Sequence, residues 1–453
     1  MLRHTKVLLG FMAVALATVH SAQLDAQSSL TIYNDGRVLV RRTVAADVAR
    51  GASTVRLPLG DLDPATLFSL DSNVVITTAS YDGAVDESSI IRRAIGRTIK
   101  FVSGKDTIAA VVLGVDPMRF RMPDGTITFS VPGLPLYPAD LVVIDPTVTL
   151  TLRSSEARKD LHLGYFTAGA NWQANYEVIL ARRGTASVQG DATISVEKLR
   201  ALEAELQLLA GSVSRAGSVR PEEDAKRMMM SARAADQMAP SEQKVGEFHL
   251  YTLPGKSTLL PGITSSISLF DPAQVTYERN LVVRGAIPWY GMLPQYGDEQ
   301  EIPVEVSYTV KRPRKTDFGD RPLPGGVARL YEPDSSGRLQ LIGEAAMDHT
   351  PAGEDLRLSA GVAFDITAKR VQTSYTTRRD SLRTWATADY SVTLTNASDS
   401  AATVDVMEQR PGEWSVLSSS IPGQKVSSTV TRFRVVVPAG GEKVLTYRVR
   451  VKW

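Results

Sequence analysis

The stretch that decides the fold is residues 161–180, which read LHLGYFTAGANWQANYEVIL. Apolar residues alternate with other residues on both sides of a run of small residues at 168–171. Because successive side chains of a strand point to opposite faces, this pattern predicts strand, turn and strand. The aromatic residues on the apolar faces of these strands, which we expect to be the structural anchor of a β core, are Tyr165, Trp172 and Tyr176.

The same pattern recurs along the chain. An Asn-Asp-Gly turn at 34–36 precedes alternating residues, short β runs divided by Gly and Pro fill 104–152, and strand, polar turn, strand repeats through 390–453. Short β runs spaced in this way are typical of sandwiches. We therefore predict an all-β, multi-domain β-sandwich architecture with an immunoglobulin-like C-terminal sandwich and a disordered internal linker.

Two segments depart from the β pattern. Residues 196–210 hold strong helix formers, with Leu at 199, 202 and 206, so propensity alone favours a helix there. Residues 215–246 are rich in Gly, Ser, Pro and charges and predict a flexible linker. Three adjacent methionines at 228–230 point in different directions in any regular structure, so we expect no metal there.

The N-terminus predicts export. Basic residues at 3, 4 and 6 precede an apolar run at 7–17 and then small residues, which is the pattern of a signal peptide, here residues 1–26. The chain has no Cys, so its domains must be stabilised by hydrophobic cores without disulfides. This combination suits a periplasmic or cell-surface protein. No later apolar run is long enough for a membrane helix, so we expect no integral helical membrane protein.

Composition and motifs exclude several chemistries. With Lys+Arg 51 against Asp+Glu 49, the charge balance does not favour nucleic acid. His162, His249 and His349 have no paired-ligand spacing, so we expect no metal and no cofactor. Ser241-Glu-Gln-Lys244 has the Ser-x-x-Lys spacing, but it lies in the predicted linker without the partner motifs, and we assign no catalytic residues.

One loop mixes aromatic and acidic residues. Aromatic faces suit the binding of a sugar or a peptide, and the alternative is that the loop folds onto its own sheet. The acids of the loop are Asp298, Glu299 and Glu301. The candidate binding residues are Trp289, Tyr290 and Tyr296. Asn396-Ala397-Ser398 has the form of a glycosylation sequon, and we interpret it as a hairpin turn.

Several pieces of sequence, taken together, resemble the bacterial domain-of-unknown-function 4139 family, which includes mucoidy-inhibitor-like proteins. The resemblance implies an exported, mainly β protein and a strand rather than a helix within 196–210, and it brings no catalytic residues. The chain departs from the family at Val310–Pro313, which leaves the local hairpin geometry open. The pieces that carry the resemblance are 31–36, 163–176, 206–211, 248–253, 323–331, 342–344, 361–365, 413–414 and 437–453.

We predict an exported envelope or surface protein that binds a protein or a glycan and is not an enzyme. A carbohydrate-active hydrolase with separated carboxylates is one alternative. A protein associated with an outer-membrane β-barrel is another, because the chain ends in alternating apolar residues and Trp453. The predicted divisions are the signal peptide 1–26, an N-terminal β domain 27–153, a second β domain 154–214 and 247–380 interrupted by the linker 215–246, and the C-terminal sandwich 381–453.

Overall fold

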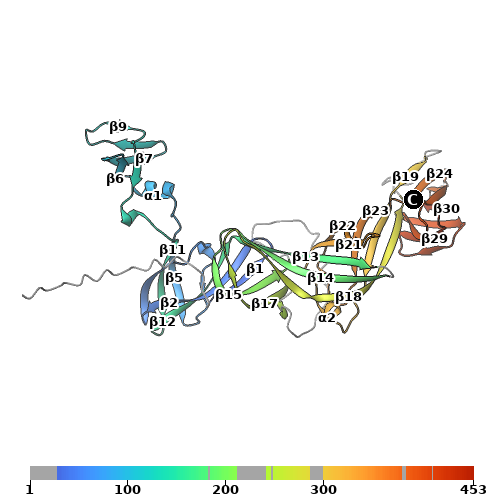
Figure 1. The fold of residues 1–453 in the computed structure, drawn as a ribbon, viewed down its shortest axis with the longest axis horizontal. Helices are drawn as coiled ribbons and strands as arrows, with labels where there is room; N and C mark the ends of the chain where they lie inside the picture. Colours follow the sequence, from blue (N-terminus) through green and yellow to red (C-terminus); the bar gives the residue numbers. More distant parts are fainter. Residues whose placement is uncertain are drawn as a thin grey trace, which may run out of the picture. The chain divides into compact units, whose positions relative to one another are not determined.

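The computed structural model describes residues 28–181, 184–211, 241–245, 248–285, 299–379, 384–410 and 412–452, with the backbone alone for 241–245. The fold is all-β, as predicted: strands dominate and the few helices are short. The chain forms two compact units, and each unit collects separate pieces of sequence (Figure 1). Unit 1 contains residues up to 171 with 195–208 and 255–264, and unit 2 contains 172–194, 209–254 and 265–453. Unit 1 therefore continues past the predicted boundary at residue 153.

Unit 1 is built on a sheet in which β15, β1, β2, β12 and β4 follow one another. The alternation of β2 and β12 puts Val38, Val40, Leu161 and Leu163 into its core, all fully buried. A second sheet has the order β3-β11-β5. The elements are β1 (Ser28–Tyr33), β2 (Arg37–Val48), β3 (Gly51–Leu57), η1 (Pro64–Thr66), β4 (Phe68–Ser69), β5 (Val74–Asp82), β11 (Thr147–Ser154), β12 (Arg158–Ala168) and β15 (Ala201–Ala210).

A further sheet of unit 1, in the order β10-β6-β7-β8-β9, has its own small core. Helix α1 supplies Ile90 and Ile91 to that core, and Asp86 caps the helix by accepting a hydrogen bond from the Ser89 amide. The rings of Phe101 and Phe120 pack edge to face within it, with their centroids 5.4 Å apart. The elements are α1 (Glu87–Arg93), β6 (Thr98–Ser103), β7 (Asp106–Val115), β8 (Met118–Arg121), β9 (Ile127–Thr128), β10 (Leu134–Leu136) and η2 (Ala139–Leu141).

Unit 2 contains a ten-stranded sheet with the path β22-β21-β13-β14-β18-β26-β29-β28, and β18 also pairs with β20, which pairs with β23. Strands β13 and β21 pair in parallel, as do β18 and β26, whereas β21 with β22, β18 with β20, β20 with β23, and β29 with both β26 and β28 pair antiparallel. The elements are β13 (Ala170–Ala181), β14 (Thr185–Val196), β18 (Thr264–Arg284), β20 (Val304–Val310), α2 (Asp317–Asp320), β21 (Gly326–Pro333), β22 (Leu339–Met347), β23 (Leu356–Val362), β26 (Ala402–Gln409), β28 (Gly423–Lys425) and β29 (Val430–Val437).

The C-terminal part of unit 2 is a sandwich. A five-stranded sheet, β19-β24-β25-β30-β27, packs on β29, and its side chains reach Glu408 of β26. The ring of Tyr447 on β30 stacks on those of Phe433 on β29 and Tyr390 on β25. The distances between ring centroids are 5.1 Å and 5.5 Å. Stacked aromatics from both sheets fill the space between them. The strands are β19 (Gln300–Ile302), β24 (Ile366–Arg379), β25 (Thr384–Asn396), β27 (Glu413–Ser419) and β30 (Gly441–Lys452).

The stretch at 161–180 forms two strands, but they do not face one another as a pair. Strand β12 lies between β2 and β4, whereas β13 lies between β21 and β14 in a different sheet. Gly169 makes the change of sheet with a φ of +100°, which favours glycine. Its carbonyl accepts a hydrogen bond from the Glu197 amide at 2.8 Å, so the connection is held by the segment after β14 rather than by a hairpin ladder.

The sequon at Asn396 is also not a hairpin turn. Strands β25 and β26 on its two sides belong to different sheets, so the segment crosses from one sheet to the other. Asn396 is fully buried, and its amide donates to the carbonyls of Ser400 at 2.8 Å and Pro438 at 3.1 Å. Its Oδ1 accepts from the Ser398 amide at 3.0 Å. The residue therefore fixes a connection in the interior.

The segment with helical propensity, 196–210, contains strand β15, as the resemblance implied. Its apolar residues serve a strand because Ala201, Leu206 and Leu208 are fully buried. The predicted linker is partly wrong at its end, since β16 (Ser241–Val245) pairs antiparallel with β17 (Phe248–Leu259). The signal segment 1–26, the rest of the linker up to residue 240 and Met228–Met230 lie outside the described residues.

Candidate functional site

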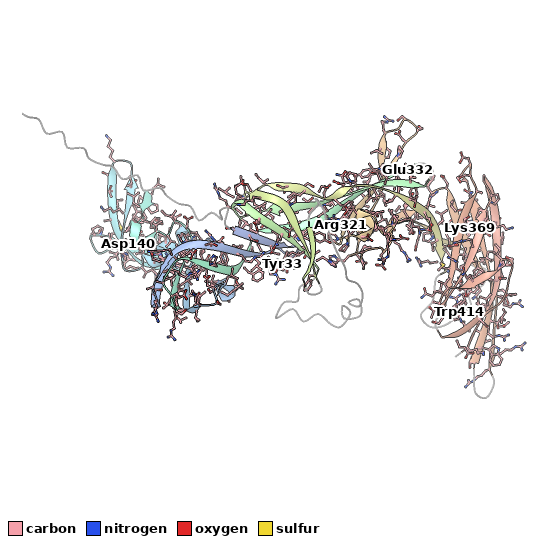
Figure 2. The ribbon with its side chains drawn as sticks, turned by 90° about the horizontal axis from the view of Figure 1, so that it is seen from below. Tyr33, Asp140, Arg321, Glu332, Lys369 and Trp414 are labelled. Atoms are coloured by element: carbon pink, nitrogen blue, oxygen red, sulfur yellow. The ribbon has the colours of Figure 1, made fainter. Side chains whose placement is uncertain are left out.

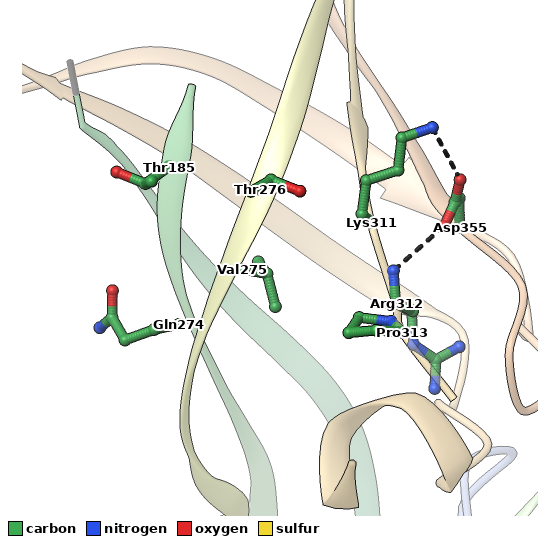
Figure 3. Close-up of a pocket in the computed structure, with 8 residues that line it drawn as sticks. All are labelled: Thr185, Gln274, Val275, Thr276, Lys311, Arg312, Pro313 and Asp355. Atoms are coloured by element: carbon green, nitrogen blue, oxygen red, sulfur yellow. Dashed lines mark hydrogen bonds and ion pairs between the residues drawn. The ribbon is translucent and has the colours of Figure 1, made fainter. Parts of the chain in front are cut away.

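An open groove of about 590 Å³ is the candidate site (Figure 3). It lies within unit 2, where the beginning of β14, the middle of β18, the end of β20 and the beginning of β23 come together. Backbone hydrogen bonds hold these strands: the Tyr277 amide donates to Gly184 O and the Lys311 amide to Thr276 O, both at 2.8 Å. The lining residues are Thr185, Gln274, Val275, Thr276, Lys311, Arg312, Pro313 and Asp355.

A carboxylate and an ammonium group form one wall of the groove. Lys311 Nζ lies 3.1 Å from Asp355 Oδ2, and the Arg312 amide donates to Asp355 Oδ1 at 3.1 Å (Figure 3). Lys311 Nζ also lies 3.4 Å from Glu278 Oε1. Burial raises the pKa of Asp355, but the hydrogen bonds from Arg312 and Lys311 and their charges outweigh it, so the pKa lies below its usual value. This wall therefore carries an ionised, already paired carboxylate.

The Arg312 side chain is buried beneath that wall and makes hydrogen bonds to backbone carbonyls. It is 2% exposed, and its guanidinium points towards α2, away from Asp355 (Figure 3). It donates to the carbonyls of Phe318 at 2.9 Å, Pro351 at 2.8 Å and Glu354 at 3.2 Å, and also to Arg321 O. Burial lowers its pKa to about 10. Carbonyl acceptors compensate the burial of this cation and fix the connection after β20.

The opposite wall carries polar side chains that form no hydrogen bond to other described residues. Thr185, Gln274 and Thr276 are exposed, and their side chains make no hydrogen bond to any other described residue. Two hydroxyls and an amide supply donors and acceptors for a ligand. Val275 and Pro313 add apolar surface beside them. The groove can therefore hold a ligand rich in hydroxyl or amide groups.

The residues expected to anchor the core are all buried. Tyr165, Trp172 and Tyr176 are 1%, 3% and 0% exposed. Each polar tip has a carbonyl acceptor: Leu59 O at 3.3 Å for Tyr165, Leu209 O at 3.3 Å for Trp172 and Pro324 O at 2.7 Å for Tyr176. Tyr165 belongs to unit 1 and the other two to unit 2, so they serve separate cores.

The aromatic binding residues expected from sequence, Trp289, Tyr290 and Tyr296, lie outside the described residues, as does Asp298. Glu299 is described, and its Oε1 accepts a hydrogen bond from Lys369 at 2.7 Å, where Lys369 is labelled in Figure 2. The aromatic loop and the groove draw on different residues of the sequence.

His162 and His349 make hydrogen bonds within the fold. His162 Nδ1 lies 2.8 Å from Asp71 Oδ1, and its amide donates to Asp71 Oδ2 at 2.9 Å. The ring of His349 accepts from the Gly325 amide at 2.9 Å, and burial first, then the charge of His249, lower its pKa. His249 and His349 are thus brought near each other, which their sequence spacing did not indicate. Within the described residues, no three His, Cys, Asp or Glu side chains gather as a metal site.

Fold and groove together define an all-β protein of several sheets with an open polar groove at its strand ends. A search of protein-family models and of curated proteins finds no match for this chain. No helix in the described part of the chain is long and apolar enough to cross a membrane.

The groove was missed by sequence reasoning because its residues are spread from Thr185 to Asp355, on β14 and β18 and just beyond the ends of β20 and β23. The one signal was at Val310–Pro313, where the chain departs from the family that it resembles, and Lys311, Arg312 and Pro313 of this segment line the groove. Thr, Gln and Lys on exposed strand positions resemble any solvated sheet face, so no local pattern marks them.

Proposed function

We propose that this chain is an exported envelope or surface protein that binds a glycan, without turning it over, in the groove lined by Gln274, Thr276 and Asp355. The observation that carries the proposal is the set of unused hydrogen-bonding side chains on one wall of a groove of about 590 Å³. Export rests on the signal-peptide pattern, and an envelope protein fits the resemblance to the domain-of-unknown-function 4139 family.

The chemistry of the walls favours a hydroxyl-rich ligand. Gln274 and Thr276 offer both donors and acceptors, as sugar hydroxyls do. The Lys311–Asp355 pair presents fixed charges that accept and donate at the other wall. Small-molecule pockets usually have a volume of about 300–1,000 Å³, so the groove is wide enough for a short oligosaccharide.

The same wall argues for binding rather than hydrolysis. A glycosidase needs a carboxylic acid whose pKa is raised, paired with a second free carboxylate. Asp355 is the one carboxylate among the described lining residues, and its pKa is lowered. Glu278 shares the same Lys311 partner. None of the described residues that line the groove supplies a general acid.

The test is calorimetric titration of the purified chain with cell-wall and capsular oligosaccharides. We expect saturable binding that weakens at least about fivefold in the double variant Gln274→Ala/Thr276→Val, since each lost hydrogen bond contributes about 0.5–1.5 kcal/mol. Gln173→Ala/Thr367→Val changes the same residue types at exposed strand positions elsewhere in unit 2 and should leave affinity unchanged.

Three results would overturn the proposal. One is the absence of binding to every oligosaccharide tested. Another is binding that survives in the groove variant, which would place the ligand elsewhere, for example at the aromatic loop tested by Trp289→Ala. The third is the release of new reducing ends during incubation, which would mean hydrolysis.

A further inference from the structure

The sheet β10-β6-β7-β8-β9 has one face covered by its own core and one face exposed. Ile99, Phe101 and Phe120 are buried on the inner face. The register places the intervening residues on the outer face: Leu136 opposite Lys100, and Ile127 opposite Arg121. We refer to the face that carries Lys100, Arg119, Arg121, Ile127, Leu134 and Leu136 as the basic–apolar face.

Large apolar side chains stand at both edges of the basic–apolar face. Leu134 and Leu136 on the edge strand β10 are 76% and 52% exposed, and Ile127 on the opposite edge strand β9 is 62% exposed. Phe129, one residue beyond β9, and Ile144, later in the same stretch of sequence, are 66% and 72% exposed. Five exposed large apolar residues within one short segment are more than the scattered single ones that need no explanation.

Cations occupy β6 and β8, the strands next to the two edges. Lys100, Arg119 and Arg121 are exposed and take part in no ion pair within residues 28–181, all of which the structure describes. Asp106 is the register partner of Ser103, so the alternation of the strand places it on the inner face. Asp140 forms an ion pair with Arg97 at 2.7 Å. The outer face therefore carries cations on β6 and β8, on either side of the central strand β7, and large apolar side chains on both edge strands.

We propose that the basic–apolar face binds the surface of an anionic phospholipid bilayer. Lys100, Arg119 and Arg121, which form no ion pair within residues 28–181, complement the negative charge of lipid phosphates. The edges of a five-stranded sheet lie roughly 19 Å apart, at about 4.8 Å between strands. Apolar side chains at such spacing enter the headgroup boundary of a bilayer together, while Lys and Arg between them meet lipid phosphates. This inference is independent of the groove.

The test is co-sedimentation of the purified chain with vesicles of phosphatidylglycerol and, separately, of phosphatidylcholine. We expect binding to phosphatidylglycerol vesicles that falls as salt rises from 0.1 to 1 M, because the Debye length shrinks from about 10 to 3 Å. Lys100→Gln/Arg121→Gln should weaken binding about thirtyfold, since each cation near an anionic surface contributes about 1 kcal/mol. Ile127→Ser/Leu134→Ser should weaken it on the same vesicles.

Matched variants distinguish vesicle binding by the basic–apolar face from nonspecific binding by exposed residues elsewhere in the chain. Phe364 is 95% exposed and Lys425 is exposed elsewhere in the chain, so Phe364→Ser/Lys425→Gln should bind vesicles as the unchanged chain does. Circular dichroism shows that each variant is folded before the assay. Equal binding to both lipids, no vesicle binding, or unchanged binding in both face variants would overturn the proposal.

Discussion

Arg370 and Glu408 form an ion pair in the interior of the C-terminal sandwich, with Nη2 and Oε2 3.3 Å apart and the side chains 5% and 0% exposed. Arg410, 3% exposed, contacts the same carboxylate. Tyr447 donates its hydroxyl to Glu408 Oε2 at 2.6 Å. Arg370 also lies 3.8 Å from the centre of the Tyr390 ring. Two sheets are thus joined by one fully buried carboxylate.

Glu408→Gln should be strongly destabilising. It leaves Arg370 and Arg410 as buried cations without a counter-charge, and breaking a buried pair by removing one partner costs about 3–5 kcal/mol. Urea unfolding followed by circular dichroism measures the loss. Replacing the trio with apolar residues, Arg370→Met/Glu408→Leu/Arg410→Met, should cost less than Glu408→Gln alone, because no buried charge remains.

The control is Asp405→Asn on the same strand. Asp405 pairs with Arg434, whose side chain is 62% exposed, and exposed pairs contribute about 0–1 kcal/mol. An equal loss in Glu408→Gln and Asp405→Asn would contradict the role of the buried network.

Asp71→Asn should change how stability depends on pH. Burial raises the pKa of Asp71, but hydrogen bonds from the His162 amide and ring and the charge of Arg158 outweigh it and lower the pKa below its usual value. A carboxyl whose pKa is lower in the folded state stabilises the fold above its unfolded pKa, about 3.9, and this stabilisation is lost as pH falls through the folded value.

Urea unfolding of both proteins from pH 7 down to acid measures this. At pH 7 the variant should be less stable by about 1–3 kcal/mol, as for hydrogen bonds to a charged group. The difference should shrink as the pH falls below about 4. Asp106→Asn, at an exposed hairpin end, should match the unchanged chain. A difference that stays constant with pH would refute the carboxylate's role.

Gly326→Ala should destabilise unit 2. A Cβ at this position would overlap the carbonyl oxygen of Ala174, its parallel partner on β13. Backbone cannot yield without moving a strand, so we expect a loss of about 3 kcal/mol by thermal or urea unfolding. At the neighbouring Gly325 a Cβ would lie 3.1 Å from Met347 O, so Gly325→Ala should cost less. The reverse order of the two losses would contradict this account.

Asn396→Ala should also be destabilising, by about 2–3 kcal/mol, because it removes a fully buried amide that donates to the carbonyls of Ser400 and Pro438 and accepts from the Ser398 amide. Asn280→Ala removes a partly exposed amide that donates to Thr309 on the adjacent strand, and it should cost under about 1 kcal/mol. Mass spectrometry of the chain expressed in a glycosylating host should find Asn396 unmodified, since its side chain is buried. Similar losses in both variants would mean that Asn396 has no special role.

Period-two alternation was enough to predict strands, because burial of one face imposes it locally: β12, β13, β25 and β30 all appear where the pattern placed them. The aromatic anchors followed from the same rule. The helix formers of 196–210 misled propensity, since Ala201, Leu206 and Leu208 serve a buried strand equally well.

The sequence by itself determined that this chain is a β protein, since alternation and turn residues act over a few positions. Which strands pair was decided only by the tertiary structure: β12 and β13, like β25 and β26, are joined by short connections yet belong to different sheets. Backbone hydrogen bonding leaves no residue pattern that identifies the partner strand. The groove and the Glu408 network depend on such long-range pairing, so they arise where Lys311 meets Asp355 and where Arg370 meets Glu408.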